Sequence, residues 1–136
     1  MNQKDNIRSL IKEKRNALTE EEKRVKDQKI FTKIINSDYY KNSNVIFVYV
    51  SFKGEVDTHK LIKYSLNIGK TICVPKVISK KEGMEAIIIN SFDELNPGKY
   101  NILEPKDSCE KIDTNRIELI LMPGVAFDKK GGRIGY

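Results

Sequence analysis

Cysteine and histidine are scarce in this sequence, and their scarcity excludes several kinds of site. The two cysteines, Cys73 and Cys109, lie far apart and form no C-x-x-C pair, so they provide neither a disulfide framework nor the ligand spacing of a zinc site. The one histidine, His59, has no serine, cysteine or aspartate partner at a spacing diagnostic of nucleophilic catalysis. We interpret His59 as a residue in the first turn of a helix, and we expect a reducing, cytoplasmic location.

Long apolar runs are also missing. No stretch approaches the length that crosses a membrane, and the opening "MNQKDNIRSL" lacks the apolar centre of a signal peptide. The sequence contains no internal repeat, low-complexity tract or linker. We therefore expect a single α/β domain over 1–136 that does not associate with membranes.

Positive charge, in contrast, is in excess. The chain has 25 lysines and arginines against 19 aspartates and glutamates, which gives a net charge of +6. This excess suits a polyanionic partner such as nucleic acid, a nucleotide or a polyglutamate tail, although basic charge also serves solubility alone. A small basic nucleic-acid-binding module is therefore an alternative function, despite the absence of RRM, KH and zinc-finger patterns.

Apolar spacing predicts helices at the start of the chain and strands further on. We expect an amphipathic helix over 4–18, and a second helix that begins at the capping box of Thr19 and Glu22 and ends near residue 36. Another helix begins at Asp57 or Thr58 and closes at Gly69. Short β-branched and apolar runs predict four strands, Val45–Ser51, Thr71–Pro75, Ala86–Ile89 and Glu118–Pro123.

This order of elements favours an α/β fold: a single open, mostly parallel sheet with helices on both faces, in a three-layer α/β/α arrangement. The intervening "LNPGKYNILEP" contains turn dipeptides and is expected to cross a sheet edge as a loop. Ligands of open parallel sheets bind beyond the carboxyl ends of the strands. Three stretches should converge there, namely "SFKGEVDTH", "PKV" and "PGVAFDKKGGRIGY".

The glycine-rich end of the last stretch looks like the start of an anion-binding loop. Its backbone N–H groups, with Lys130 and Arg133, could hold a phosphate. The stretch is not a Walker loop, because GxxxxGK[ST] is absent, and it is not a complete GxGxxG fingerprint, because Lys130 occupies the first glycine position. A surface turn with two glycines is the alternative.

Two further features have both a functional and a structural interpretation. The carboxylate of Glu55 can accept two hydrogen bonds from an amino-pyrimidine or pterin edge, or it can be a solvated or helix-capping charge. Lys4, Arg8 and Arg15 lie along one side of the first helix, where they form either a phosphate clamp or a solvated basic face.

Together, these residues resemble the 5-formyltetrahydrofolate cyclo-ligase family, also called 5,10-methenyltetrahydrofolate synthetase. The similarity runs in order through "KDNIRSLIKEKRNAL", "YVSFKGEVDTHKLI", "GKTICVPKV", "GKYNILEP" and "LILMPGVAFDKKGGRIGY". In the family, the last segment continues as R-L-G-x-G-x-G-Y-Y-D, followed by a further helix and strand. The resemblance therefore implies a chain truncated at its C-terminus and inactive alone, with the closing sheet elements and an acidic residue linked with magnesium beyond Tyr136.

The resemblance also implies an activity. The reaction is the ATP-dependent cyclisation of 5-formyltetrahydrofolate, with or without a polyglutamate tail, to 5,10-methenyltetrahydrofolate, with ATP and Mg²⁺ as cofactors. It requires no nucleophilic residue and no nucleic acid. By resemblance, Arg8, Val50 and Glu55 would contact the folate. The residues implied for ATP are Lys4, Asp5, Asn6, Ile7, Arg8, Arg133, Ile134, Gly135 and Tyr136, and no metal ligand is implied within this chain.

Overall fold

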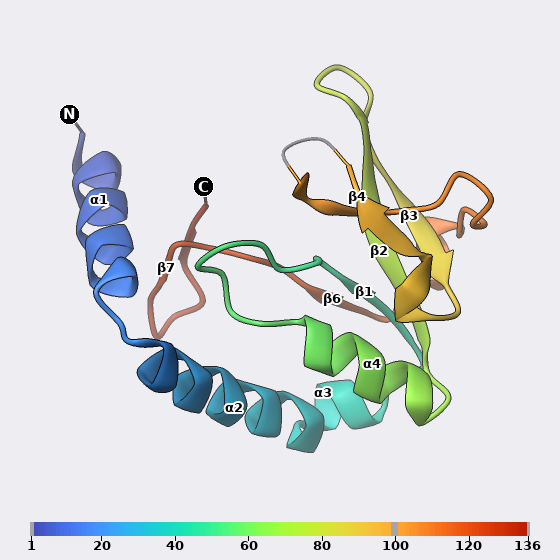
Figure 1. The fold of residues 1–136 in the computed structure, drawn as a ribbon, viewed down its shortest axis with the longest axis horizontal. Coiled ribbons are helices and arrows are strands. Elements are labelled where there is room, and N and C mark those ends of the chain that lie inside the picture. The colour runs from blue at the N-terminus through green and yellow to red at the C-terminus, as the bar shows by residue number, and fades with distance from the viewer. Residues whose placement is uncertain (1, 99–100, 136) are drawn as a thin grey trace.

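A computed structural model describes residues 2–98 and 101–135, and a four-stranded sheet forms its centre (Figure 1). The strand order is β3-β2-β1-β6. Strand β1 (Val45–Val48) pairs in parallel with β2 (Thr71–Ser79) and with β6 (Leu119–Leu121), whereas β3 (Gly83–Ile89) runs antiparallel to β2. The predicted α/β class and the mostly parallel sheet are confirmed.

Helices form the N-terminal part of the chain, as the apolar spacing predicts. The capping box is present, because Thr19 Oγ1 accepts the Glu22 N–H and the Glu22 carboxylate accepts the Thr19 N–H, each at 3.1 Å. This exchange satisfies two amides that the first helical turn leaves without partners. The α-helices are α1 (Gln3–Asn16), α2 (Glu20–Asn36), α3 (Asp38–Lys41) and α4 (His59–Asn67).

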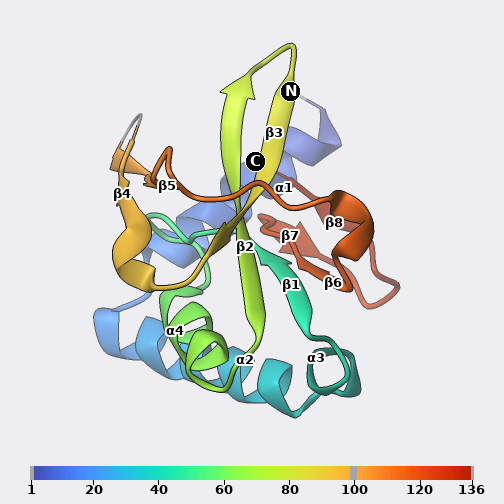
Figure 2. The ribbon, with the colours of Figure 1, turned by 90° about the vertical axis from the view of Figure 1, so that its right-hand side faces the viewer.

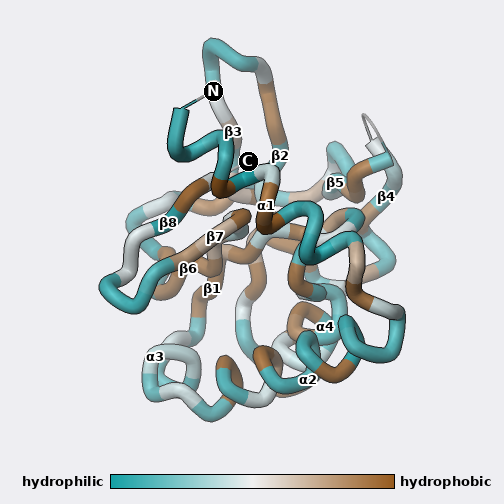
Figure 3. Tube along the Cα trace, turned by 90° about the vertical axis from the view of Figure 1, so that its left-hand side faces the viewer, coloured by the Kyte–Doolittle hydropathy of each residue, from teal (hydrophilic) through white to brown (hydrophobic). Residues whose placement is uncertain are grey.

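The main core lies between one face of the sheet and helices α2, α3 and α4, which lie together below the sheet in Figures 1 and 2. In α2 apolar and polar segments alternate along the helix (Figure 3), and the apolar ones face this core. Burying one such aliphatic side chain stabilises the fold by about 1.5–3 kcal/mol. The buried core includes Ile46 and Val48 from β1, Ile72 and Val74 from β2, and Ile62 from α4, and the partly buried Phe31, Ile34 and Ile35 of α2 pack against it.

The opposite face of the sheet is covered by the segment 106–117. Ile112 is buried there against Cys73 and Ala86, and its N–H donates to the Ala86 carbonyl at 3.0 Å. A bridge between Ile87 and Lys111 fixes the segment beside β3. Within residues 2–98 and 101–135, therefore, helices pack on one face and coil on the other, and the predicted helices on both faces are not seen. None of the helices in these ranges is long and apolar enough to cross a membrane.

Several predicted elements differ in extent. Strand β1 ends at Val48 instead of Ser51. Strands β2 and β3 are longer than predicted, because they continue past the sheet as one antiparallel hairpin that turns at 80–82. The expected loop "LNPGKYNILEP" contains a small two-stranded sheet of its own, formed by β4 (Leu95–Pro97) and β5 (Leu103–Pro105).

Candidate functional site

The loop after β1 is closed by a pair of hydroxyl side chains. The buried Thr58 accepts the Ser51 N–H at 2.9 Å and donates to the Tyr49 carbonyl at 2.8 Å. Ser51 Oγ in turn accepts the Thr58 N–H at 3.0 Å. These side-chain bonds replace ladder hydrogen bonds and explain why the strand stops early. The loop 51–58 therefore lies fixed at the carboxyl end of β1.

Glu55 sits inside this loop and is half-buried. It follows Gly54, whose φ of +77° lies in the left-handed region that favours glycine. The Glu55 N–H donates to the Phe52 carbonyl at 3.0 Å, and Glu55 Oε1 accepts the Phe52 N–H at 2.7 Å. In the part of the chain that the structure describes, Glu55 Oε2 accepts no hydrogen bond, so one carboxylate oxygen is available to a ligand.

Glu55 and Val50 border the same cavity, which has a volume of about 490 Å³. Its other walls come from the end of β2 and from the segment 102–104, and they are mainly apolar, with Val77, Ile78 and Ile102 among them. On its other side Glu55 borders a second cavity of about 390 Å³. Both cavities lie beyond the carboxyl end of β1, where the sheet topology predicts the ligand. The structure thus brings Val50 and Glu55 together.

Helix α1 carries two arginines that contact different loops. Arg8 Nε donates to the Gly135 carbonyl at 2.8 Å, and its Nη1 pairs with Asp5 Oδ1 at 2.8 Å. Two turns further along the helix, Arg15 Nε donates to the Gly54 carbonyl at 2.9 Å. Figure 1 shows α1 beside the C-terminal hairpin and away from the helical layer under the sheet. The interaction of Arg15 with Gly54 was not anticipated from sequence, where the spacing of 7 from Arg8 gave the only signal.

The other sequence-predicted residues of this region have varied exposure. Lys4 and Asn6 are exposed, and Ile7 is half-buried. Arg8 brings residues 5–8 of α1 to Gly135. Gly135 directly follows Ile134, the last residue of β8 (Arg133–Ile134). Tyr136 lies outside the described residues.

The glycine-rich stretch forms a hairpin turn between β7 (Ala126–Phe127) and β8. Its amides already have an anionic partner, because Asp128 Oδ1 accepts the N–H groups of Lys130 at 2.8 Å and of Gly132 at 2.7 Å. Arg133 Nη1 donates to the Pro123 carbonyl at 2.7 Å. The Gly131 N–H donates to the Asp128 backbone carbonyl at 3.4 Å, so the amides of 130–132 all have internal partners, which favours the alternative of a surface turn.

His59 is the first residue of α4, as predicted. Because a carbonyl oxygen only accepts, His59 Nε2–H is the donor in its 2.9 Å hydrogen bond with the Ser51 carbonyl. The helix start is capped by the Asp57 carboxylate, which accepts the N–H groups of His59 and Lys60 at 3.3 and 3.4 Å, although Thr58 occupies the N-cap position. His59 thus holds the loop in place and is not free to act as a general base through Nε2.

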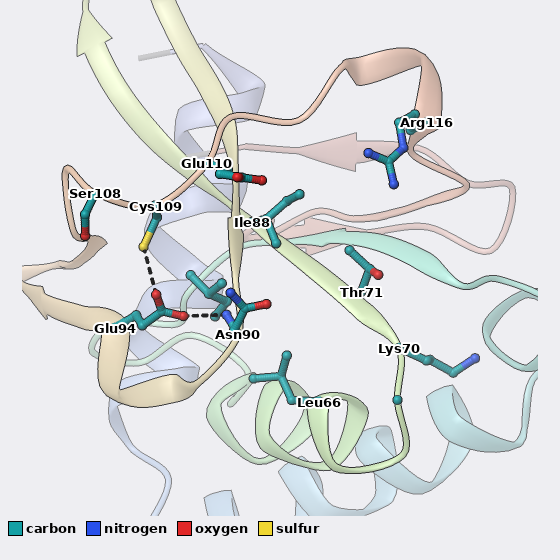
Figure 4. Close-up of a pocket in the computed structure, with 12 residues that line it drawn as sticks. Leu66, Lys70, Thr71, Ile88, Asn90, Glu94, Ser108, Cys109, Glu110 and Arg116 are labelled. Atoms are coloured by element: carbon teal, nitrogen blue, oxygen red, sulfur yellow. Dashed lines mark hydrogen bonds between the residues drawn. The ribbon is translucent and has the colours of Figure 1, made fainter.

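A further cavity of about 700 Å³ lies at the opposite, amino-terminal end of β2 (Figure 4). Both oxygens of the Glu94 carboxylate in its wall are already hydrogen-bonded: Oε1 accepts the Asn90 and Ser91 amides at 2.5 and 3.1 Å, and Oε2 accepts the Cys109 thiol at 3.3 Å. The hydrogen bond from Asn90 is the main reason why the pKa of Glu94 is lowered. These groups satisfy one another, and the cavity lies at the wrong end of the strands, so the Glu55 loop is the better candidate site.

Comparison with known proteins gives a consistent result. The profile of the 5-formyltetrahydrofolate cyclo-ligase family matches residues 1–136. A probable 5-formyltetrahydrofolate cyclo-ligase of Caenorhabditis elegans is 30% identical over 139 residues, which cover 98% of this chain and 68% of that protein. Among solved structures, the 5,10-methenyltetrahydrofolate synthetase of Aquifex aeolicus has a TM-score of 0.86 at 31% identity, with 98% of this chain and 66% of that chain covered.

A second solved structure, a 5,10-methenyltetrahydrofolate synthetase from Mycoplasma pneumoniae, has a TM-score of 0.71 at 28% identity and covers 99% of this chain and 72% of that chain. The chain therefore spans about two thirds of the length of the relatives that it matches. A profile match over the whole chain, a relative at 30% identity and a shared fold agree. The protein belongs to the 5-formyltetrahydrofolate cyclo-ligase family.

Proposed function

We propose that the protein catalyses the ATP-dependent cyclisation of 5-formyltetrahydrofolate to 5,10-methenyltetrahydrofolate, with release of ADP and phosphate. The observation that carries this proposal is the cavity shared by Val50 and Glu55 at the carboxyl end of β1, in a chain of this family. The family assignment favours this function over binding of nucleic acid. A single domain and a cytoplasmic location stay predictions from sequence.

The folate would enter the cavity of about 490 Å³, a size that suits a small-molecule site. The free oxygen of the Glu55 carboxylate would accept hydrogen bonds from the N–H groups of the pterin edge. Val50, which is 7% exposed, would supply an apolar contact at the base of the cavity. The hydrogen bond from Phe52 to Glu55 Oε1 holds the carboxylate for this task without using its second oxygen.

The nucleotide would bind where α1 meets β8. Lys4 and Arg8 would supply positive charge, and the backbone of 133–135 lies next to Arg8. Within residues 2–98 and 101–135 no group of three or more histidine, cysteine, aspartate or glutamate side chains could hold a metal ion. Magnesium would therefore arrive on the phosphates of ATP, and we assign it no ligand in these residues.

The reaction requires the protein to position the two substrates and to neutralise the phosphate charge. The formamide oxygen of the substrate is a poor leaving group until it receives the terminal phosphoryl group of ATP. N10 of the folate then attacks the activated formyl carbon, the ring closes and phosphate leaves. Such a sequence needs in-line alignment of the two substrates and neutralisation of the phosphate charge, which basic side chains of α1 would provide. It needs no nucleophilic side chain.

The test is an absorbance assay of methenyltetrahydrofolate formation with the complete translation product that contains these residues. We expect product when ATP, magnesium and 5-formyltetrahydrofolate are all present, and none when ATP is omitted. The Glu55→Gln variant should form product with a higher KM for the folate. Absence of product from the folded wild-type protein, under conditions in which a known family enzyme is active, would refute the proposal.

A further inference from the structure

We propose that Arg15 is a positioning residue for the substrate site, because it fixes the peptide that precedes Glu55. The inference rests on the proposed function, in which the Glu55 carboxylate binds the pterin. Arg15 belongs to α1 and reaches a loop that lies 39 residues further along the chain. It contacts the backbone of that loop and does not need to touch the substrate.

Arg15 contacts the Gly54 carbonyl through two donor groups. Both Nε and Nη2 of Arg15 donate to the carbonyl oxygen of Gly54, with Nε at 2.9 Å. A planar guanidinium that directs two N–H groups at one oxygen fixes both the position and the direction of that carbonyl. A lysine ammonium would supply a point charge on a rotatable stem and fix the direction less well.

The held peptide determines where Glu55 points. Gly54 has a φ of +77°, and its carbonyl carbon is bonded directly to the nitrogen of Glu55. That nitrogen donates to Phe52 O, and the Glu55 carboxylate accepts from Phe52 N, so both ends of Glu55 depend on the same turn. A rotation of the Gly54 peptide would break this pair of contacts and swing the carboxylate away from the cavity wall.

Burial does not account for the location of α1, since no residue of the helix is buried. The described long-range hydrogen bonds of α1 run from Arg8 to Gly135 and from Arg15 to Gly54, so each arginine links the helix to a distant part of the chain. These two arginines lie two turns apart on one side of the helix. α1 thus spans the proposed nucleotide segment with Arg8 and the proposed folate loop with Arg15.

The first experiment needs no ligand. Amide hydrogen exchange measured by NMR on the free protein reports the Phe52 and Glu55 N–H groups, both of which are bonded inside the turn. In Arg15→Ala both amides should exchange about tenfold faster, a change typical of one lost charge-assisted hydrogen bond. Arg15→Lys should lie between Arg15→Ala and the wild type.

Arg24→Ala provides the matched control, since Arg24 is an exposed arginine of α2 that pairs with Glu21. It should leave both exchange rates unchanged. Exchange rates in Arg15→Ala equal to those of the wild type would overturn the proposal.

The second experiment measures binding by calorimetry, with 5-formyltetrahydrofolate and ATP titrated separately. Arg15→Ala should weaken the folate about tenfold and leave ATP affinity unchanged, with partial recovery in Arg15→Lys. An equal loss for both ligands, or no loss for the folate, would contradict a positioning role. If the wild type itself binds no folate, the proposed function fails, and the exchange experiment still decides whether Arg15 holds the loop.

Discussion

Arg8 and Gly135, which are 127 residues apart in the chain, are joined by a 2.8 Å hydrogen bond from Arg8 Nε to the Gly135 carbonyl. The bond places the start of the first helix against the last described strand. The two segments that we propose to bind ATP are thereby in direct contact. They share the charge of Arg8, which also pairs with Asp5.

The double variant Lys4→Ala with Arg8→Ala tests this surface. We expect its affinity for ATP to fall roughly 10- to 100-fold, because two charges that we propose to bind phosphate are lost. Its melting temperature should change little, since partly exposed ion pairs add about 0–1 kcal/mol to stability. Calorimetry with ATP and a thermal melt give both values. A double variant at Lys29 and Arg24, on the exposed side of α2, is the control, and a large drop in melting temperature with normal ATP affinity would contradict the prediction.

Glu55→Gln tests the folate contact. The change keeps the shape of the side chain and removes the charge, so about 1.5–3 kcal/mol of binding free energy should be lost, or roughly 10- to 150-fold in affinity. Calorimetry with 5-formyltetrahydrofolate measures the loss. Glu104→Gln is the matched control, because Glu104 borders the same cavity and has no proposed contact with the pterin. Equal effects of the two changes would indicate that general charge, and not a specific pairing, attracts the substrate.

Asp128→Ala tests the hairpin turn. Loss of the two amide hydrogen bonds should weaken the pairing of β7 with β8 by about 1 kcal/mol. The reporter is hydrogen exchange at the Val125 N–H, which donates to the Ile134 carbonyl at 2.8 Å and should exchange about fivefold faster. Asp113→Ala removes a comparable side-chain bond from a distant turn and should have no effect on this amide.

A substitution at Gly132 adds a coupling test to the same hairpin. A Cβ at this position would lie 2.5 Å from Asp128 Oδ2, so Gly132→Ala should displace the carboxylate and speed the exchange of the Val125 amide. In the Asp128→Ala background the clash is absent, so Gly132→Ala should speed the exchange of the Val125 amide by a smaller factor. Additive effects would contradict the described geometry.

The stability of the protein should also depend on pH through Glu118. Its carboxylate accepts the Asn44 and Val45 amides at 2.7 and 2.9 Å, and the hydrogen bond from Asn44 is the main reason why its pKa lies below the ordinary value of 4.5. A group with a lowered pKa in the folded state stabilises it above the unfolded pKa, and this contribution is lost as the pH falls through the folded pKa.

Glu118→Gln should therefore lower the melting temperature near neutral pH, and the difference from the wild type should shrink as the pH falls below about 4.5. Thermal melts between pH 3 and pH 7 measure this difference. Glu82→Gln, in the exposed turn of the β2–β3 hairpin, is the control and should show no such trend. A difference that stays constant over the whole range would show that Glu118 does not act through its charge.

Local patterns in the sequence predict much of the fold. The capping box at Thr19 and Glu22 sets the start of α2, and the β-branched run at Val45 places β1. Both signals depend only on residues that are close in the sequence, so contacts with distant parts of the chain do not change them. The family resemblance named Val50 and Glu55 as site residues, and the structure places both on one cavity after β1.

Contacts between residues far apart in the chain could not be predicted from local sequence patterns. The covering of the second sheet face by Ile112 depends on a bridge to β3 that no local pattern indicates. The early end of β1 depends on the hydrogen bonds between Ser51 and Thr58, which compete with the strand ladder. The sequence left the glycine stretch open between an anion-binding loop and a surface turn, because nothing in its spacing showed that Asp128 would fold back onto its amides.

The reciprocal bonds between Ser51 and Thr58 also bear on how the loop between them can be altered. They close the loop at its two ends, so the entropy of closure is offset by contacts that lie outside the residues between them. An exposed position of the loop such as Lys53, which borders the cavity of about 390 Å³ beside Glu55, can then be varied while Gly54, Glu55 and the points of attachment stay where they are. A library of side chains at this position is therefore a direct route to altered ligand preference on an unchanged scaffold.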